Sequence, residues 1–205
     1  MSRSPMFPLG SVLLPGGVLP LHIFEPRYRQ LVADCLAGTP EFGVVLIERG
    51  SEVGGGDVRT DVGTLARIVG AQELGDGRWQ LVAVGTRRLR VLRWFDDDPY
   101  PLAEVEDWDD DPSSPLPDGE AYATLVAGAR DVLALAARAR VAAGELGESV
   151  ADDPRLGTYE VAAALPIGPL DRQRVLATEG AAARVALLGE LIADARLLIE
   201  ATLDG

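Results

Sequence analysis

The sequence of 205 residues contains no lysine, and all 19 of its basic residues are arginine. This absence excludes several kinds of catalysis. A P-loop needs a lysine at its phosphates, a serine–lysine protease needs one as its general base, and a Schiff-base enzyme needs its amine. We therefore predict that the protein is not an enzyme, since it holds neither the P-loop lysine nor the protease dyad.

Cysteine and histidine are almost as scarce, because Cys35 and His22 are the single examples of each. No disulfide can form within the chain, and no cluster of cysteine and histidine ligands can be assembled. We therefore expect no metal and no other cofactor. A chain without disulfides suits the reducing cytoplasm, which is the location that we predict.

No apolar run approaches the length of a membrane span, and Pro5, Pro8, Pro15 and Pro20 interrupt the apolar amino terminus. Neither a membrane helix nor a secretory signal is expected. The formal net charge is −13, from 32 acidic and 19 basic residues, which repels phosphate groups and acidic lipid surfaces. Nucleic acid and membranes are therefore disfavoured partners. The hydrophobic share of 47% is enough to bury a core.

Residues 7–29 combine strands, a turn and the start of a helix. Short apolar runs at residues 12–14 and 18–24 predict strands, and Pro15-Gly16-Gly17 predicts the turn between them. Pro26 suits the first turn of a helix, which continues with apolar residues at helical spacing. This apolar stripe, which ends before Gly38, consists of Tyr28, Leu31, Val32, Cys35 and Leu36.

The remainder of the first half is predicted to be β-structure, because apolar and β-branched runs recur between turn signals. The expected strands are residues 42–48, 62–74, 78–84, 87–95 and 102–108. Gly75-Asp76-Gly77 predicts a hairpin turn, and the glycine-rich residues 54–57 predict a loop.

A stretch rich in proline and aspartate, from Asp96 onward, separates this region from a helical one. Such a composition cannot form a core, so we expect a β-rich subdomain at residues 1–111 and a helical subdomain at residues 112–205. The helical period is carried first by Tyr122, Leu125, Val126, Ala129, Val132, Leu133 and Ala136. A loop at residues 144–153, a short helix at residues 156–165, another that begins at Pro169 and a final helix at residues 181–203 complete the prediction. The final helix has an apolar face made of Val185, Leu188, Leu191, Ile192, Ala195, Leu198 and Ile199. This order predicts the α+β fold class.

Several of these segments together resemble one family. Residues 7–9 read Phe-Pro-Leu and residues 20–28 read Pro-Leu-His-Ile-Phe-Glu-Pro-Arg-Tyr. Residues 62–68 and 85–91 resemble two further family strands, with Leu89 in place of the usual phenylalanine, and residues 159–166 resemble a helix that ends at a proline. Over residues 5–203 the chain is similar to the LON substrate-binding domain, which is the N-terminal domain of Lon protease.

The resemblance implies a PUA-like fold, in which a small β pseudo-barrel with one helix precedes a helical bundle. Since no ATPase or protease module is present, we expect a stand-alone domain of bacterial origin. The implied function is non-enzymatic binding of exposed, unfolded or misfolded protein segments, linked to proteolysis or protein quality control, with a protease or chaperone as partner. An RNA-binding PUA-like protein and an enzyme of unrecognised type stay open as alternatives, and no motif specifies an oligomeric state.

Four aromatic residues in the connector between the halves are candidates for peptide binding: Trp94, Phe95, Tyr100 and Trp108. Large apolar side chains in a polar, proline-rich stretch are either covered by the fold or used for recognition. If part of this surface is exposed, it supplies binding area for an extended segment.

The residues of the family signature, His22, Glu25, Pro26, Arg27 and Tyr28, are expected to be structural. His22 can act as a general base or form hydrogen bonds within the fold, and the second role is favoured because no nucleophile is predicted beside it. Glu25 and Arg27 stand where a strand meets a helix, which favours a local ion pair over a ligand contact.

The only basic concentration consists of Arg87, Arg88, Arg90 and Arg93. On a strand Arg88 and Arg90 share one face, so we expect a solvated sheet face paired with carboxylates, with anion or RNA contact as the alternative. The aspartate runs 96–98 and 109–111 lack the spacing of a calcium loop and are expected to be solvated linker.

Overall fold

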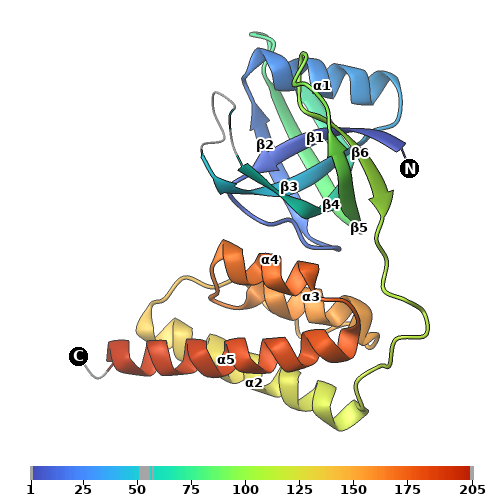
Figure 1. Cartoon of the computed structure of the whole chain (residues 1–205). Coiled ribbons are helices and arrows are strands. Elements are labelled where there is room, and N and C mark those ends of the chain that lie inside the picture. The colour runs from blue at the N-terminus through green and yellow to red at the C-terminus, as the bar shows by residue number, and fades with distance from the viewer. Residues whose placement is uncertain (1, 51–55, 57, 204–205) are drawn as a thin grey trace. The chain divides into compact units, whose positions relative to one another are not determined.

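The structure is a computed structural model that describes residues 2–50, 56 and 58–203, and it divides into two compact units, Met1–Asp109 and Asp110–Gly205 (Figure 1). The first unit is the β-rich one. Its elements are β1 (Ser2–Leu9), β2 (Val18–Ile23), α1 (Pro26–Ala37), β3 (Glu41–Arg49), β4 (Val58–Glu73), β5 (Trp79–Trp94) and β6 (Leu102–Asp107). The second unit holds α2 (Gly119–Ala139), α3 (Pro154–Ala164), α4 (Pro169–Ala177) and α5 (Ala181–Leu203).

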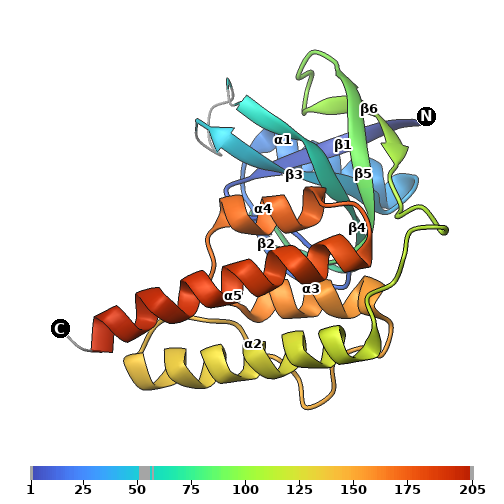
Figure 2. The same ribbon diagram turned by 60° about the horizontal axis from the view of Figure 1, so that its bottom comes forward.

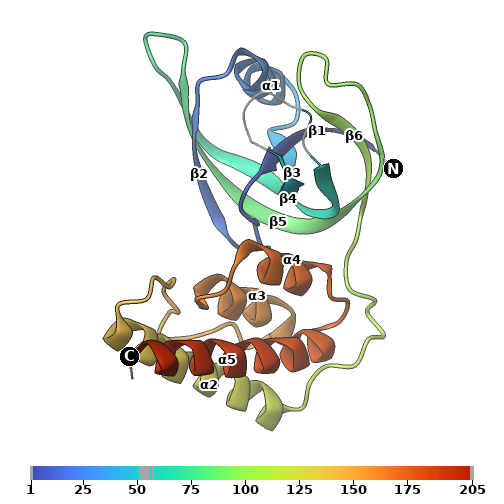
Figure 3. The same ribbon diagram turned by 60° about the vertical axis from the view of Figure 1, so that its left-hand side comes forward.

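The strands close into a barrel because β5 and β1 each change partners along their length. β5 pairs with β4 along most of its length, with β2 through residues 79–84 and with β6 through residues 89–94. β1 pairs antiparallel with β6 through residues 2–5, and its second half, Met6–Leu9, pairs parallel with β3. The ring β5–β4–β3–β1–β6 is thus complete, with β2 added beside β5 (Figure 3). The expected α+β pseudo-barrel with one helix is confirmed.

Helix α1 closes one end of the barrel with the stripe that its spacing predicts. Tyr28, Leu31, Val32 and Cys35 are buried and belong to one core cluster with residues from β1 to β5. Leu36, which was expected on the same stripe, is 41% exposed. It lies just beyond the face that the barrel covers, so that assignment was wrong.

The prediction of a strand at residues 12–14 was wrong, because the first strand is β1, earlier in the chain. The prolines of β1 are tolerated because each half of the strand pairs with one neighbour, which leaves alternate backbone N–H positions without a ladder partner. The predicted turn is confirmed: Gly17 N–H donates to the Leu14 carbonyl at 2.9 Å, and Gly16 adopts a φ of +81°.

Residues 78–84 and 87–95 were expected as two strands and instead form the single strand β5. Gly85 lies near the middle of β5 and contacts the segment that precedes β2. Its N–H donates to the Gly17 carbonyl at 2.9 Å, and a Cβ at Gly85 would lie 2.5 Å from the Leu14 carbonyl oxygen. The glycine therefore allows close backbone contact and does not mark a turn.

Three further strands and a hairpin turn predicted for the barrel unit are confirmed. The strands expected at residues 42–48, 62–74 and 102–108 are β3, β4 and β6, with bounds that differ by a few residues. The hairpin turn at Gly75-Asp76-Gly77 is confirmed by a 2.7 Å bond from Leu74 N–H to the Arg78 carbonyl. Of the predicted loop at residues 54–57, only Gly56 is described; the other three residues lie outside the described part of the chain.

In the helical unit all four expected helices are present. The long helices α2 and α5 run side by side and parallel (Figure 2). They meet through buried residues of the two predicted stripes: Leu125, Ala129, Val132 and Ala136 from α2, and Leu188, Leu191, Ile192, Ala195 and Ile199 from α5. Leu198 was expected on the same face and is 71% exposed, so its assignment was wrong.

A buried ion pair fixes the start of this unit. The Arg184 side chain is fully buried and donates to both carboxylate oxygens of Asp110, at 2.9 and 2.7 Å. It also donates to the Thr158 hydroxyl at 3.0 Å and lies over the Tyr159 ring. Asp110 therefore packs with the helices, and the expectation that residues 109–111 are solvated linker was wrong for this residue. No helix in the described ranges is long and apolar enough to cross a membrane.

Candidate functional site

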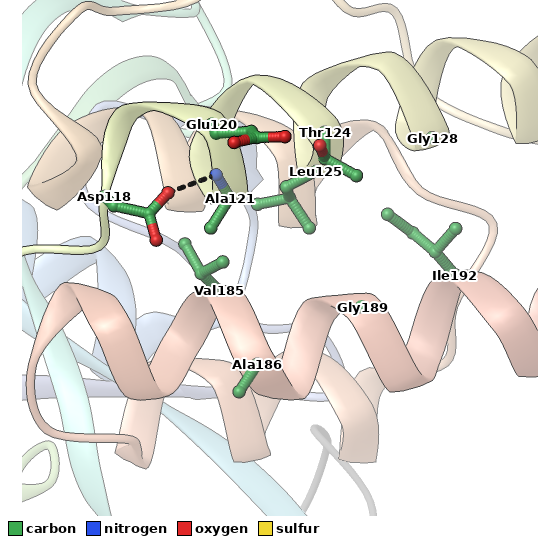
Figure 4. A pocket seen from close by; sticks show the side chains of 10 residues that line it. All are labelled: Asp118, Glu120, Ala121, Thr124, Leu125, Gly128, Val185, Ala186, Gly189 and Ile192. Carbon is green, nitrogen blue, oxygen red and sulfur yellow. Dashed lines mark hydrogen bonds between the residues drawn. The ribbon is translucent and has the colours of Figure 1, made fainter.

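The parallel helices α2 and α5 line an open groove (Figure 4). Asp118 begins α2 by accepting a hydrogen bond from Ala121 N–H at 2.6 Å, which satisfies one of the free donors at the helix start. Farther along, Gly128 lies opposite Ile192, and a Cβ at that glycine would be 3.7 Å from the isoleucine Cγ2. A side chain at position 128 would thus make an ordinary contact with Ile192, and the space of the groove lies beside this contact.

The groove has a volume of about 550 Å³, within the range of ordinary ligand sites. Its α2 wall spans residues 118–128, about three turns or about 15 Å, and its α5 wall spans residues 185–192, about two turns or about 10 Å. The lining residues are Asp118, Glu120, Ala121, Thr124, Leu125, Gly128, Val185, Ala186, Gly189 and Ile192. Small and aliphatic side chains make up most of this surface, with the two carboxylates at the α2 start.

This arrangement suits the binding of an apolar segment. The lining contains no histidine, cysteine or arginine that could act as a nucleophile, a base or an electrophile. Across the described ranges, no group of three histidine, cysteine, aspartate or glutamate side chains is placed to hold a metal ion. An apolar groove with charge at one end can hold an apolar segment and orient it.

The structure places the predicted aromatic residues in the barrel unit, and arginine covers several of their rings. Arg59 lies 4.6 Å from the centre of the Trp94 ring. Arg3 and Arg93 lie 4.2 and 4.5 Å from the centre of the Phe95 ring. The faces that would receive an apolar ligand are thus partly occupied by cation–π contacts.

Trp94 and Phe95 also line an open pocket of about 470 Å³. The Arg59 side chain forms a two-bond ion pair with Asp97 in this pocket, with the shorter distance 2.7 Å. Carboxylates make the rest of the lining polar: Asp61, Asp96 and Asp97. Aspartates 96 and 97, expected as solvated linker, therefore lie in a pocket with aromatic walls.

Two arginines of β5 lie over the ring of Trp108. Arg88 and Arg90 lie 4.4 and 4.2 Å from the centre of its ring. Arg88 is only 3% exposed, so the prediction of a solvated arginine face was wrong for this residue. The reason is that a planar guanidinium can stack on indole, which lets β5 bury an arginine against an aromatic neighbour.

The neighbouring arginine, Arg87, is paired with carboxylates instead. It donates to Asp107 at 2.7 Å and lies 3.9 Å from Glu41. The hydrogen bond with Asp107 raises the pKa of Arg87 above its ordinary value. The basic run of β5 is consequently engaged by the protein's own carboxylates and aromatic rings.

Tyr100 is buried, and its hydroxyl donates to Asp34 Oδ2 at 2.8 Å. Burial is the larger cause, and this hydrogen bond the second, of a rise in the pKa of Tyr100 to about 12. Burial likewise raises the pKa of the Cys35 thiol to about 12, so that the thiolate is not available as a nucleophile near neutral pH. The four aromatic candidates do not meet in one site, and peptide binding by them stays a prediction.

Three of the five signature residues, His22, Glu25 and Tyr28, line a small cavity of about 110 Å³ at the junction of β2 and α1. Glu25 and Arg27 form an ion pair at 3.1 Å, and Arg27 lies over the Tyr28 ring, which stacks on Phe7 with ring centres 4.1 Å apart. Pro26 is at the first turn of α1. These contacts connect the helix to the barrel core.

His22 was expected to form hydrogen bonds within the fold, and its side chain forms none among the described residues. It is exposed on β2, opposite Gln80, with its ring 6.5 Å from that of Phe24. No serine or cysteine lines the small cavity beside it. The assignment of structural roles to the five signature residues stays a prediction.

The groove between α2 and α5 was missed by the sequence reasoning. Its signal was present as Gly128 and Gly189, because glycine in the middle of a helix is unfavourable and needs a reason. Both glycines were passed over, since only the apolar stripes were used.

Comparison with known proteins gives a consistent result. Residues 3–194 match the family model described as the ATP-dependent protease La (LON) substrate-binding domain. Lon protease 2 of Myxococcus xanthus is 35% identical over 192 residues, which is 92% of this chain and 23% of that protein. Lon protease of Anaeromyxobacter dehalogenans is 34% identical over 194 residues, which is 92% of this chain and 22% of that protein.

Two solved structures have the same fold. The crystal structure of a Lon N-terminal domain protein from Xanthomonas campestris matches with a TM-score of 0.68 and 30% identity, covering 92% of this chain and 97% of that one. The N-terminal domain of the Mycobacterium avium complex Lon protease matches with a TM-score of 0.61 at 18% identity, covering 94% and 99% of the two chains. This chain thus spans less than a quarter of the two Lon proteases above and nearly all of the two N-terminal domain structures.

Proposed function

Because the chain belongs to the family of the LON substrate-binding domain, we propose that it binds exposed apolar segments of unfolded or misfolded proteins and carries out no reaction on them. The observation that carries this proposal is the α2–α5 groove, whose aliphatic and small side chains leave about 550 Å³ open. An apolar segment that enters such a groove removes apolar surface from water on both partners, which is the main driving force for this kind of recognition.

The wider context of the proposal is proteolysis or protein quality control in the cytoplasm. Two relatives named Lon protease contain the matched region as 22 to 23% of their length. We propose that this chain delivers what it binds to a protease or a chaperone.

The absence of lysine supports a role without catalysis, as do two features of the fold. The only cysteine is buried, with its pKa raised to about 12, and the only histidine is on an exposed strand position. The remaining candidates for an enzyme are carboxylates and hydroxyls, and neither gathers in the groove in a catalytic arrangement.

The RNA-binding alternative is weakened by the state of the arginines on β5. Arg87 is paired with carboxylates, and Arg88 and Arg90 stack on Trp108. With a formal net charge of −13, the chain repels a phosphate backbone unless such arginines are free to contact it. Salt-sensitive binding of mixed RNA that is lost in an Arg88→Ala/Arg90→Ala variant would revive this alternative.

The pocket beside Trp94 and Phe95 is the second candidate site for the same function. It favours recognition because two aromatic side chains are half-buried at its wall. Its arginine and aspartate lining suits a more polar segment than the groove does.

Binding of a fluorescently labelled apolar peptide, followed by anisotropy, tests the function and separates the two sites. We expect Gly189→Leu to weaken binding at least about tenfold, because the new side chain fills the groove, where no protein atom lies within 4 Å of the added Cβ. The matched control is Ala201→Leu, an exposed position on the same helix outside the groove lining.

Two results would redirect or reject the proposal. Binding that survives Gly189→Leu and disappears in Trp94→Ala/Phe95→Ala would transfer the site to the barrel pocket. No binding of any apolar peptide, or cleavage of unfolded casein or ATP by the purified chain, would contradict the function itself.

A further inference from the structure

The α2–α5 groove is charged at one end and apolar along the rest. Asp118 and Glu120 lie at the start of α2, while the lining from Leu125 onward on α2 and along α5 carries no charge (Figure 4). Among the described residues, neither carboxylate has a cationic side chain within ion-pair distance. Asp131, one turn beyond the groove on α2, is by contrast paired with Arg196 of α5 at 3.6 Å.

The two carboxylates stabilise the start of α2, because the positive end of the helix dipole attracts negative charge. Only one oxygen of Asp118 is used, in the bond from Ala121 N–H. A segment that enters the groove therefore meets two negative charges at this end, whatever they contribute to the helix itself.

Gly189 adds an observation about the width of the groove. It lies in the middle of α5, where glycine is the least favourable residue after proline. Packing against the rest of the described structure does not require it, because a Cβ at this position would meet no atom within 4 Å beyond its chain neighbours and the nearby backbone of its own helix. Its absent side chain leaves space for another molecule to approach the α5 backbone.

We propose that the groove selects apolar segments that carry an arginine or a lysine next to the apolar run, with the cation placed against Asp118 and Glu120. This inference rests on the proposed function and specifies its ligand. Charge complementarity is the argument: an acidic segment is repelled at the α2 end, and a neutral one leaves both carboxylates without a cationic partner. Along its shorter wall, on α5, the groove accommodates about two helical turns or three extended residues of the ligand.

The test uses the full chain and three labelled peptides of about ten residues that share one apolar sequence and end in arginine, glutamine or glutamate. We expect the arginine peptide to bind about threefold to tenfold more tightly than the glutamate peptide, because exposed ion pairs are individually weak. The difference should shrink as salt is raised, since ions screen charges on the surface.

The variant that isolates the effect is Asp118→Asn/Glu120→Gln. Asparagine still caps the helix, so the fold of α2 is kept while both charges are removed. We expect this variant to bind all three peptides alike. The control, Asp194→Asn/Glu200→Gln, makes the same change in net charge at exposed α5 positions outside the groove lining and should preserve the preference.

The outcomes separate the inference from the proposed function. Equal affinity of the parent for the arginine and glutamate peptides, with binding still blocked by Gly189→Leu, overturns the selection and leaves the function in place. An arginine preference that survives Asp118→Asn/Glu120→Gln overturns it as well. Self-association of the chain that is abolished by Gly189→Leu would mean that a second copy occupies the groove, which also contradicts the inference.

Discussion

The barrel unit and the helical unit use glycine in opposite ways. In the barrel, Gly85 is required, because a Cβ would lie 2.5 Å from the Leu14 carbonyl oxygen. In the helical unit, Gly189 has open space where its side chain would be. The first glycine serves the fold, whereas the second leaves a surface open at some cost to its helix. The difference indicates where the molecule has room for a ligand.

The two units also differ in how their exposed features are covered. In the barrel, arginines stack on Trp94, Phe95 and Trp108, so that cations and aromatic rings satisfy one another. In the described part of the chain, no arginine lines the α2–α5 groove to cover its apolar side chains in this way. A ligand would compete with contacts within the protein at the barrel and would not do so at the groove.

The open space at the groove indicates a ligand site only if the rest of the helical unit is tightly packed. The buried ion pair between Arg184 and Asp110 allows a test of that packing. We expect Asp110→Ala to lower the free energy of unfolding by about 3–5 kcal/mol, because Arg184 would be left buried without its counter-charge. Urea denaturation measures the change. Asp131→Ala removes an exposed ion pair and should cost less than about 1 kcal/mol. Similar effects for the two variants would mean that the unit is not tightly packed.

The barrel half of the comparison is tested by Gly85→Ala. The added methyl group would be forced against the Leu14 carbonyl and would lie 3.0 Å from Thr64 Cγ2, so we expect a loss of about 2–4 kcal/mol in urea denaturation. The control is Gly70→Ala on β4, where the nearest atom, Val82 Cβ, is 3.8 Å away. That variant should change stability by less than about 1 kcal/mol. A tolerated Gly85→Ala would remove the contrast with the groove glycine.

High pH tests the barrel interior in another way. The pKa of Cys35 rises from 9.0 to about 12 on folding, and that of Tyr100 rises from 10.0 to about 12. At high pH the unfolded chain therefore loses these two protons before the folded chain does, and this loss favours unfolding. Stability is therefore retained below about pH 9 and lost as the pH rises toward 12, at up to about 1.4 kcal/mol per pH unit for each group. Denaturation of the parent and of Cys35→Ala between about pH 8 and 11 should show a flatter decline in the variant. Parallel declines would contradict this account.

The smallest expected effect is that of Gly189→Ala, which should change stability and binding in opposite directions. Gly189→Ala should raise the free energy of unfolding by up to about 1 kcal/mol, because alanine is the better helix residue and its Cβ meets no protein atom. Peptide binding should weaken at the same time, since the methyl group enters the groove. Denaturation and anisotropy on one preparation measure both quantities. Gain of stability without loss of affinity would remove Gly189 from the ligand site.

Much of the local structure could be read from the sequence because local chemistry determines it. Pro26 starts α1, Gly75-Asp76-Gly77 makes a hairpin turn, and the apolar spacing of α2 identifies its buried face. Such features depend on backbone preferences and on side-chain periodicity within one segment. The family resemblance, now supported by the match over residues 3–194, supplied the pseudo-barrel that periodicity alone does not specify.

Predictions failed where a partner distant in the sequence decides the outcome. Arg88 is buried because Trp108, twenty residues later, offers it a ring to stack on. Leu36 and Leu198 have helical spacing that suits burial, yet no neighbouring element covers them. Spacing shows which residues share a face and gives no information about what that face meets.

The sequence by itself determined the division into a β-rich half and a helical half, the four helices of the second half, the absence of lysine chemistry and the family. Only the tertiary structure decided that arginines cover the aromatic candidates and that two helices, separated by more than forty residues of chain, form an open groove with glycine on both walls. The physical reason is that composition and periodicity act within a segment, whereas exposure, charge pairing and open volume depend on contacts between segments.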